Sequence, residues 1–156
     1  MKVKLISIGK TDESYIKEGV NKYILRLKHY VSFEVLELKD VKLGKKSNQI
    51  LQKEKEGDEI MKCISKSDFV VLLDEKGMEF NSVGFSKFLQ KRMNAGAGVV
   101  FVIGGPFGFS KELYDRSNAK VALSQMTFSH QMVRLFFVEQ LYRGFTILKG
   151  EKYHHI

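Results

Sequence analysis

Two short segments of the chain, residues 69–73 and 99–103, are apolar at every position. They read FVVLL and VVFVI. A strand with one face in water alternates apolar and polar residues, whereas a strand of a parallel sheet covered by helices on both faces is a continuous apolar run. The sequence therefore predicts two central strands in a sheet that carries helices on both faces.

Strands and helices alternate along the rest of the chain. Three more strands are predicted, at residues 2–9, 31–38 and 121–123. Helices are predicted to begin at Thr11 or Asp12, at Ser47 or Asn48, at Ser82, after Ser110 and near Ser129, with a turn at Lys76 and Gly77. Five strand–helix repeats in 156 residues indicate the α/β class, with a largely parallel sheet and one domain over residues 1–156.

The charge balance favours a polyanionic partner. The chain has 26 Lys and Arg against 18 Asp and Glu, a formal net charge of +8. Four lysines gather between two predicted elements: Lys39, Lys42, Lys45 and Lys46. Neutralising phosphates supplies sequence-independent affinity for nucleic acid, although a generally basic surface without such a partner is an open alternative. Charge does not choose between RNA and DNA.

Cysteine usage and hydropathy predict a cytoplasmic protein with no membrane association. The single cysteine, Cys63, excludes an intramolecular disulfide, is typical of a reducing compartment, and is interpreted as a small buried residue on a helix. The N-terminus lacks a long apolar stretch, and no segment approaches the roughly 20 apolar residues of a membrane span.

A glycine-rich loop at residues 104–108, GGPFG, directly follows the second apolar strand. It lacks the Gly-Lys-Ser/Thr ending of a phosphate loop and does not match G-x-G-x-x-G. Adjacent glycines let the backbone approach a ligand closely and adopt positive φ, but a tight turn explains them equally well. Since ligands of α/β sheets bind beyond the carboxyl ends of strands, this loop is a candidate cofactor site.

A second candidate loop, residues 123–128, follows the last predicted strand. Its sequence, LSQMTF, mixes apolar groups with short hydrogen-bonding ones and suits a ligand with an aromatic base and a polar tail. A plain connection into the next helix, with Ser129 as its cap, is the alternative.

The predicted final helix is apolar around most of its circumference, more than one core-facing stripe requires. Its apolar residues are Met132, Val133, Leu135, Phe136, Phe137, Val138, Leu141, Tyr142 and Phe145. The surplus predicts a homodimer. Glu139 and Arg143 are spaced for an ion pair, while His130, Arg134 and Arg143 are an alternative polar site. The histidines and the cysteine show no metal-ligand spacing, so no metal is expected.

Several ordered blocks in the last third of the chain carry a family resemblance. They are FVIGG at residues 101–105 with Gly108, SQMTF at 124–128 with His130 and Gln131, EQLYR at 139–143, and Tyr153 with His154. Over its whole length the chain resembles the H-type large-subunit ribosomal RNA methyltransferases of the SPOUT superfamily. The resemblance implies a C-terminal trefoil knot, a homodimer, S-adenosylmethionine as methyl donor, and methylation of N3 of a pseudouridine in 23S rRNA on assembled ribosomes.

The resemblance also implies the site residues. The donor-binding positions are Leu73, Gly104, Leu123, Ser124, Gln125, Met126, Thr127 and Phe128. Arg143, Tyr153 and His154 match residues near the target base, and His154 is preferred to His155 because it directly follows Tyr153. Methyl transfer to N3 needs its proton removed or the developing anion held, for which Arg143 offers fixed charge and His154 a group active near neutral pH.

The family resemblance, together with the position of the tail just beyond the long helix, implies a composite site in which the tail reaches the neighbouring subunit's donor. A tail that folds back on its own chain is the alternative.

Two other functions compete with this reading. A non-catalytic rRNA-binding assembly factor leaves the glycine loop and tail without a role, and a knotted transfer-RNA methyltransferase is disfavoured by the absence of an appended RNA-binding domain.

Overall fold

A computed structural model describes residues 1–44 and 48–155. Lys45 and Lys46 of the predicted lysine cluster, and Ser47, one of two predicted caps, lie outside the described residues. The described part forms β1 (Lys2–Ile8), α1 (Ser14–Leu27), β2 (Ser32–Leu38), α2 (Gln49–Met61), β3 (Phe69–Glu79), α3 (Ser82–Ala95), β4 (Val99–Ile103), α4 (Lys111–Arg116), β5 (Ala119–Ala122) and α5 (His130–Leu148). The predicted alternation of strands and helices is confirmed.

The strands form one sheet in the order β2-β1-β4-β3-β5, and every neighbouring pair is parallel. The two fully apolar segments are the first part of β3 and the whole of the buried β4. Both strands lie inside the sheet as predicted, while the half-buried β2 is an edge strand. All strands therefore point their carboxyl ends toward the same edge, where the following loops gather.

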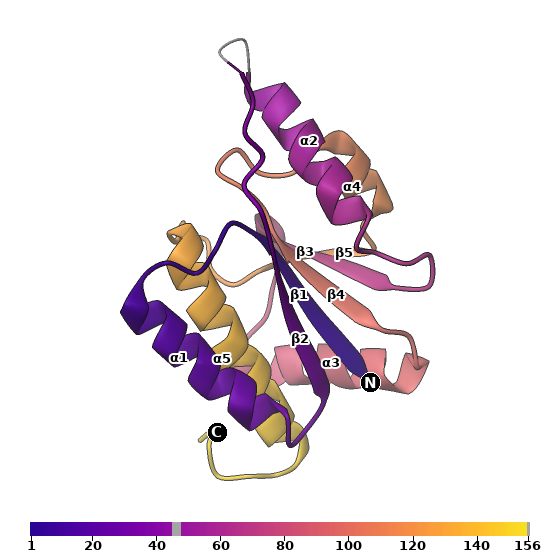
Figure 1. Cartoon of the computed structure of the whole chain (residues 1–156). Coiled ribbons are helices and arrows are strands. Elements are labelled where there is room, and N and C mark those ends of the chain that lie inside the picture. The colour runs from indigo at the N-terminus through magenta and orange to yellow at the C-terminus, as the bar shows by residue number, and fades with distance from the viewer. Residues whose placement is uncertain (45–47, 156) are drawn as a thin grey trace.

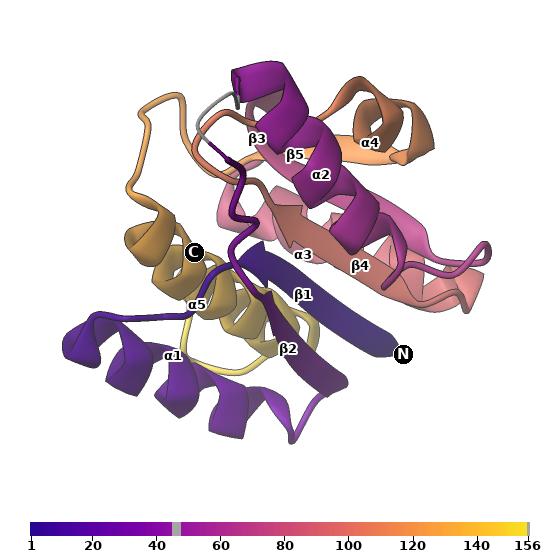
Figure 2. The ribbon, with the colours of Figure 1, turned by 45° about the horizontal axis from the view of Figure 1, so that its top comes forward.

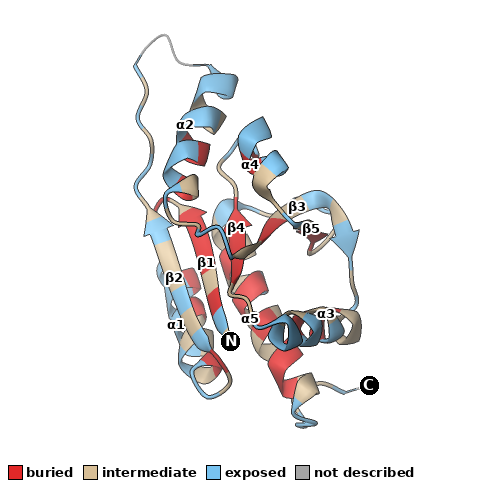
Figure 3. Cartoon of the chain, turned by 90° about the vertical axis from the view of Figure 1, so that its right-hand side faces the viewer, coloured by how far each residue is buried: buried red, intermediate tan, exposed pale blue. Residues whose placement is uncertain are grey.

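Helices cover both faces of the sheet (Figures 1 and 2). Alternate residues of the same strand enter different cores. Phe101 packs with α1, α3 and α5, whereas Val100 and Val102 pack with Ile60 of α2 and Leu113 of α4. The inner strands are accordingly buried and the outer surfaces of α2 and α4 are exposed (Figure 3). This two-sided burial explains the absence of polar positions in β4.

The predicted turn at Lys76 and Gly77 is wrong, because β3 continues through both residues to Glu79. The register against β5 shifts between Leu73 and Met78. A Cβ atom on Gly77 would lie 2.6 Å from the backbone of Lys120, so the glycine marks a close approach of two strands. Glycine signals both a turn and such an approach, and only the tertiary contact distinguishes them.

Helix caps were predicted with mixed success. The Asn48 side chain accepts from the backbone N–H of Leu51, and the Ser110 and Ser129 hydroxyls accept at the starts of α4 and α5. Neither Thr11 nor Asp12 caps α1, which begins after Glu13 without a side-chain cap. The Thr11 backbone and hydroxyl donate to Glu37 instead.

Two further observations concern burial and hydropathy. Cys63 lies just beyond the end of α2 and is only half-buried, contrary to the prediction of a buried helical residue. In the part of the chain that the structure describes, no helix is long and apolar enough to cross a membrane.

Candidate functional site

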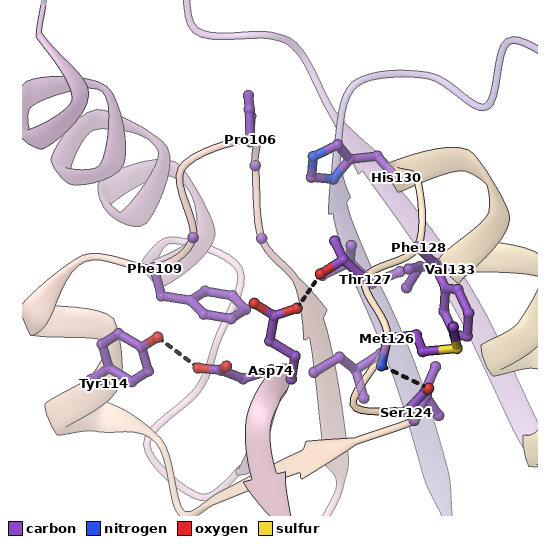
Figure 4. A pocket seen from close by; sticks show the side chains of 17 residues that line it. Asp74, Pro106, Phe109, Tyr114, Ser124, Met126, Thr127, Phe128, His130 and Val133 are labelled. Carbon is purple, nitrogen blue, oxygen red and sulfur yellow. Dashed lines mark hydrogen bonds between the residues drawn. The ribbon is translucent and has the colours of Figure 1, made fainter.

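A cavity of about 240 Å³ lies where the middle of β3 meets the loops after β4 and β5. Its wall includes seven of the eight predicted donor-binding residues: Leu73, Gly104, Leu123, Ser124, Met126, Thr127 and Phe128. Gln125 is exposed and does not line it. Figure 4 shows Phe109 and Tyr114 on one side of the cavity, Thr127 and Phe128 on the other, and Asp74 between them. Strand β3 and two loops that are far apart in sequence thus build one site beside the carboxyl ends of β4 and β5.

The glycine loop closes on itself at one end of the cavity. The backbone N–H of Gly108 donates to the Gly105 carbonyl at 3.2 Å, and Gly108 has φ +87°. Gly104 does not adopt positive φ; a Cβ atom there would instead lie 3.1 Å from the Phe109 ring. The expected special backbone conformation therefore belongs to Gly108, and Gly104 provides room for close packing.

The loop after β5 forms the opposite wall. The Thr127 hydroxyl donates to the Glu75 carboxylate at 2.5 Å, and the Met126 N–H donates to the Ser124 hydroxyl at 2.9 Å. The Met126 side chain is 77% exposed, so this wall ends in an apolar lip that projects into solvent. The hydrogen bond from Thr127 to Glu75 holds the end of the loop against β3, whereas Met126 at the middle of the loop is exposed to solvent.

Two carboxylates in the wall, Asp74 and Glu75, were missed by the sequence analysis. They follow Leu73 on β3, and the Tyr114 hydroxyl donates to Asp74 at 2.6 Å (Figure 4). Burial and this hydrogen bond raise the pKa of Tyr114 to about 12. Their position after an apolar strand was a usable signal, because strand ends deliver side chains to this edge.

A second polar group lies near the other end of α5. Arg143 donates to Glu139 at 2.6 Å, which confirms the predicted ion pair. An Nη atom of Arg143 lies 3.1 Å from Nδ1 of His154, and the guanidinium lies 4.7 Å from the centre of the Tyr153 ring. The Tyr153 hydroxyl donates to Glu139 at 2.9 Å. The structure therefore brings together all three residues predicted near the target base, and His155 remains exposed.

Electrostatics fix the charge states in this second group. Hydrogen bonding to Glu139 raises the pKa of Arg143, which stays cationic. Burial, followed by hydrogen bonds with Tyr23 and Glu139, raises the pKa of Tyr153 well above its usual value. Tyr153 is therefore a neutral phenol at physiological pH and does not serve as a base.

Two tyrosines from the start of the chain hold the tail. The hydroxyls of Tyr23 and Tyr153 are 3.3 Å apart, and the Tyr30 hydroxyl donates to Glu151 at 2.6 Å. Tyr23 and Tyr153 are 130 positions apart, and nothing in the sequence signalled their contact. Within one chain the tail therefore folds back onto its own α1 and α5.

The two residue groups do not meet within one chain. Val133 lines the cavity and Arg143 belongs to the second group, ten residues further along α5, which corresponds to about 15 Å of helix. The alternative polar site of His130, Arg134 and Arg143 does not form. His130 lines the cavity, whereas the guanidinium of Arg134 is buried against backbone carbonyls of β1 and its following loop.

The described residues contain no cluster of three or more His, Cys, Asp or Glu that could hold a metal ion. A cavity built from loops at the carboxyl edge of a parallel sheet, apolar with a few polar groups, characterises an α/β protein with a small-molecule site.

Comparisons with known proteins identify the family. A family model described as "Predicted SPOUT methyltransferase" matches residues 1–154. The chain is 55% identical over 156 residues to ribosomal RNA large subunit methyltransferase H of Cytophaga hutchinsonii, covering 99% of this chain and 100% of the relative. Proteins of the same name from Christiangramia forsetii and Parabacteroides distasonis are 54% and 51% identical, with 99% of both chains covered in each case. The chain belongs to the SPOUT methyltransferase family.

Proposed function

We propose that this protein transfers a methyl group from S-adenosylmethionine to N3 of a pseudouridine in large-subunit ribosomal RNA. The observation that carries the proposal is the gathering of Leu73, Gly104 and most of the 123–128 loop around one cavity. The relatives' shared name, ribosomal RNA large subunit methyltransferase H, supports the choice of substrate. A ribosomal substrate places the reaction in the cytoplasm and gives the net charge of +8 a function.

The residues of the cavity fit the donor. Leu73, Leu123 and Phe128 offer apolar surface for an adenine ring, and Gly104, which packs closely against the Phe109 ring, lines the cavity beside them. Asp74 and Glu75 place negative charge beside a ligand that carries a cationic sulfonium. Bound there, S-adenosylmethionine supplies an activated methyl group, and the task of the chain is to hold and orient it.

The second group suits the target base. Arg143 offers only N–H donors, so Nδ1 of His154 accepts and the neutral ring carries its proton on Nε2. That N–H, together with the Arg143 charge, stabilises the negative charge that develops on the uracil ring as its N3 proton passes to solvent water. Tyr153, neutral and packed beneath Arg143, keeps the guanidinium in place.

A homodimer would bring the two groups together, although they lie apart within one chain. Each cavity then receives Arg143, Tyr153 and His154 from the partner subunit, which gives two composite sites per dimer. The α5 helix packs against α1 and α3 of its own chain, which accounts for much of its apolar surface, but Phe136 remains 40% exposed. This residue belongs to the surface that we assign to the partner.

The test of the activity uses labelled S-adenosylmethionine with free 23S rRNA, separated large subunits and whole ribosomes that lack the modification. We expect methyl transfer to assembled ribosomes and a label at N3 of pseudouridine. Calorimetry measures donor binding separately. A protein that binds the donor and labels none of these substrates would contradict the assigned target, and one that does not bind the donor would contradict the proposed activity.

The composite arrangement has its own test. Deletion of residues 153–156 should spare donor binding and abolish transfer, whereas Gly104→Val should abolish donor binding. A mixture of the two inactive variants should form heterodimers with one site that has both an intact cavity and an intact tail, and so regain part of the activity. No recovery in confirmed heterodimers would show that the tail acts within its own chain or that both sites must be intact.

A further inference from the structure

A buried carboxyl group lies directly behind the glycine loop. Glu56 of α2 is only 3% exposed, and its Oε1 atom has no hydrogen-bond partner among the residues that the structure describes. Its Oε2 atom accepts from Gln52 at 3.4 Å, which is a long hydrogen bond. Burial, and secondarily the nearby Asp40, raise the pKa of Glu56. A buried polar atom without a partner is costly, so this side chain requires an explanation.

The nearest part of the functional site is Gly105. A Cβ atom on Gly105 would lie 2.4 and 2.5 Å from the two carboxyl oxygens of Glu56, and its three nearest atoms all belong to that residue. The glycine therefore lets the carboxyl group reach the loop backbone. The next residue of α2 makes a similar approach, because a Cβ on Gly57 would lie 2.5 Å from the hydroxyl of Ser110. Consecutive residues of α2 thus contact both ends of the segment 105–110.

Glu56 is also connected to the neighbouring loop after β2. The Gln52 side chain donates to the Val41 carbonyl at 3.1 Å as well as to Glu56. A chain of contacts consequently runs from the loop after β2, through α2, to the loop after β4. No residue of α2 lines the donor cavity, so this contact reaches the cavity only through the glycine loop.

We propose that Glu56 is a positioning residue that holds the loop 104–108 in the shape that receives the methyl donor, through contact of its carboxyl group with Gly105. The inference rests on the proposed function for the identity of the ligand but not for the contact itself. A loop that is released from this support occupies its binding shape only part of the time. If that fraction falls to roughly one tenth, the apparent donor affinity falls about tenfold.

The first experiment compares Glu56→Ala with Glu54→Ala, which removes the same charge from an exposed position of α2. Amide hydrogen exchange without donor should accelerate across residues 104–109 in Glu56→Ala and stay unchanged in Glu54→Ala, with β1 protected in both. Calorimetry should show a donor affinity about tenfold weaker for Glu56→Ala only. Glu56→Gln, which keeps the shape of the side chain, should retain both properties within about twofold.

The second experiment tests the contact itself. Gly105→Ala should weaken donor binding in the wild-type background, because its methyl group displaces the Glu56 carboxyl group. Combined with Glu56→Ala, the same substitution should have a much smaller effect, since the space is vacant. If Glu56→Ala does not fold, Glu56→Asp, which withdraws the carboxyl group by one methylene, replaces it in both comparisons.

Equal effects of Gly105→Ala in the two backgrounds would overturn the proposal, as would unchanged loop exchange in a folded Glu56→Ala. A wild-type protein that does not bind S-adenosylmethionine would instead contradict the proposed function. In that case the exchange experiment still decides whether Glu56 supports the loop.

Discussion

Replacing Arg134 with methionine should destabilise the protein far more than replacing its charged partner. Arg134 is 3% exposed on α5 and donates from Nη1 to the Gly9 carbonyl, the Thr11 hydroxyl and Glu37, at 2.9 to 3.1 Å. From Nη2 it donates to the Ile8 carbonyl at 2.8 Å. It therefore joins α5 to the end of β1 and the loop that follows it.

The magnitude follows from what the substitution leaves behind. Methionine preserves most of the packing but leaves two buried carbonyls without a donor, at about 1–3 kcal/mol each. The two losses together amount to roughly 2–6 kcal/mol, and we expect Arg134→Met to lower the free energy of unfolding by about 3–5 kcal/mol. Glu37 is 36% exposed and regains water, so Glu37→Gln should cost about 1 kcal/mol or less.

The assay is urea unfolding at pH 7, followed by far-UV circular dichroism because the chain contains no tryptophan. Protein concentration is held constant, since the proposed dimerisation would contribute to apparent stability. With a slope of about 2 kcal/mol/M, the midpoint of Arg134→Met should fall by roughly 1.5–2.5 M. Equal losses for the two variants would refute the reasoning, because the ion pair rather than the carbonyl contacts would then dominate.

Three further outcomes are expected. Gly104→Val should abolish donor binding measured by calorimetry, because its side chain enters the space beside the Phe109 ring; unchanged affinity in a folded variant would remove Gly104 from the site. The raised pKa of Tyr114 favours the neutral phenol in the folded state, so its contribution to stability is complete below pH 10 and is lost as pH rises toward 12. Tyr114→Phe should therefore reduce the alkaline loss of stability in thermal unfolding, and an unchanged pH profile would show that Tyr114 does not titrate with a raised pKa in the folded protein. Phe136→Asp should shift the dimer toward monomers in light scattering, and an unaltered mass would place the interface elsewhere.

The sheet and the cavity could be predicted because both follow from local patterns. Burial on two faces removes polar residues from β4, and a parallel sheet carries the loops after its strands to one edge. Loops 104–108 and 123–128 were therefore recognisable as site loops before their contact was known. Gln125 shows the limit of this reasoning, since a loop position does not determine which side chains face inward.

The contacts that could not be predicted join residues far apart in sequence. Arg134 binds backbone carbonyls more than 120 residues away, and backbone acceptors leave no mark in the sequence. Tyr23 and Glu56 lie on amphipathic helices, where an aromatic ring reads as core and a glutamate as solvated surface. In each case the role of the residue depends on the group that it contacts within the chain, not on its own type.

The proposed dimer, in which two copies complete each other's sites, has a consequence for the packing of α5. In a dimer with two-fold symmetry, each subunit makes the same contacts to its partner. The group around Arg143 of each subunit would therefore have to reach the other subunit's cavity near Val133. These two residues lie five positions on either side of Val138, and they share one helical stripe with Phe136 and Gln140. Antiparallel packing of two α5 helices along this stripe would place each Arg143 beside the partner's Val133. The ring of the exposed Phe136 packs against that of Phe128, with 4.7 Å between the ring centres. In this arrangement Phe136 would lie close to the two-fold axis, where a charge should be most disruptive.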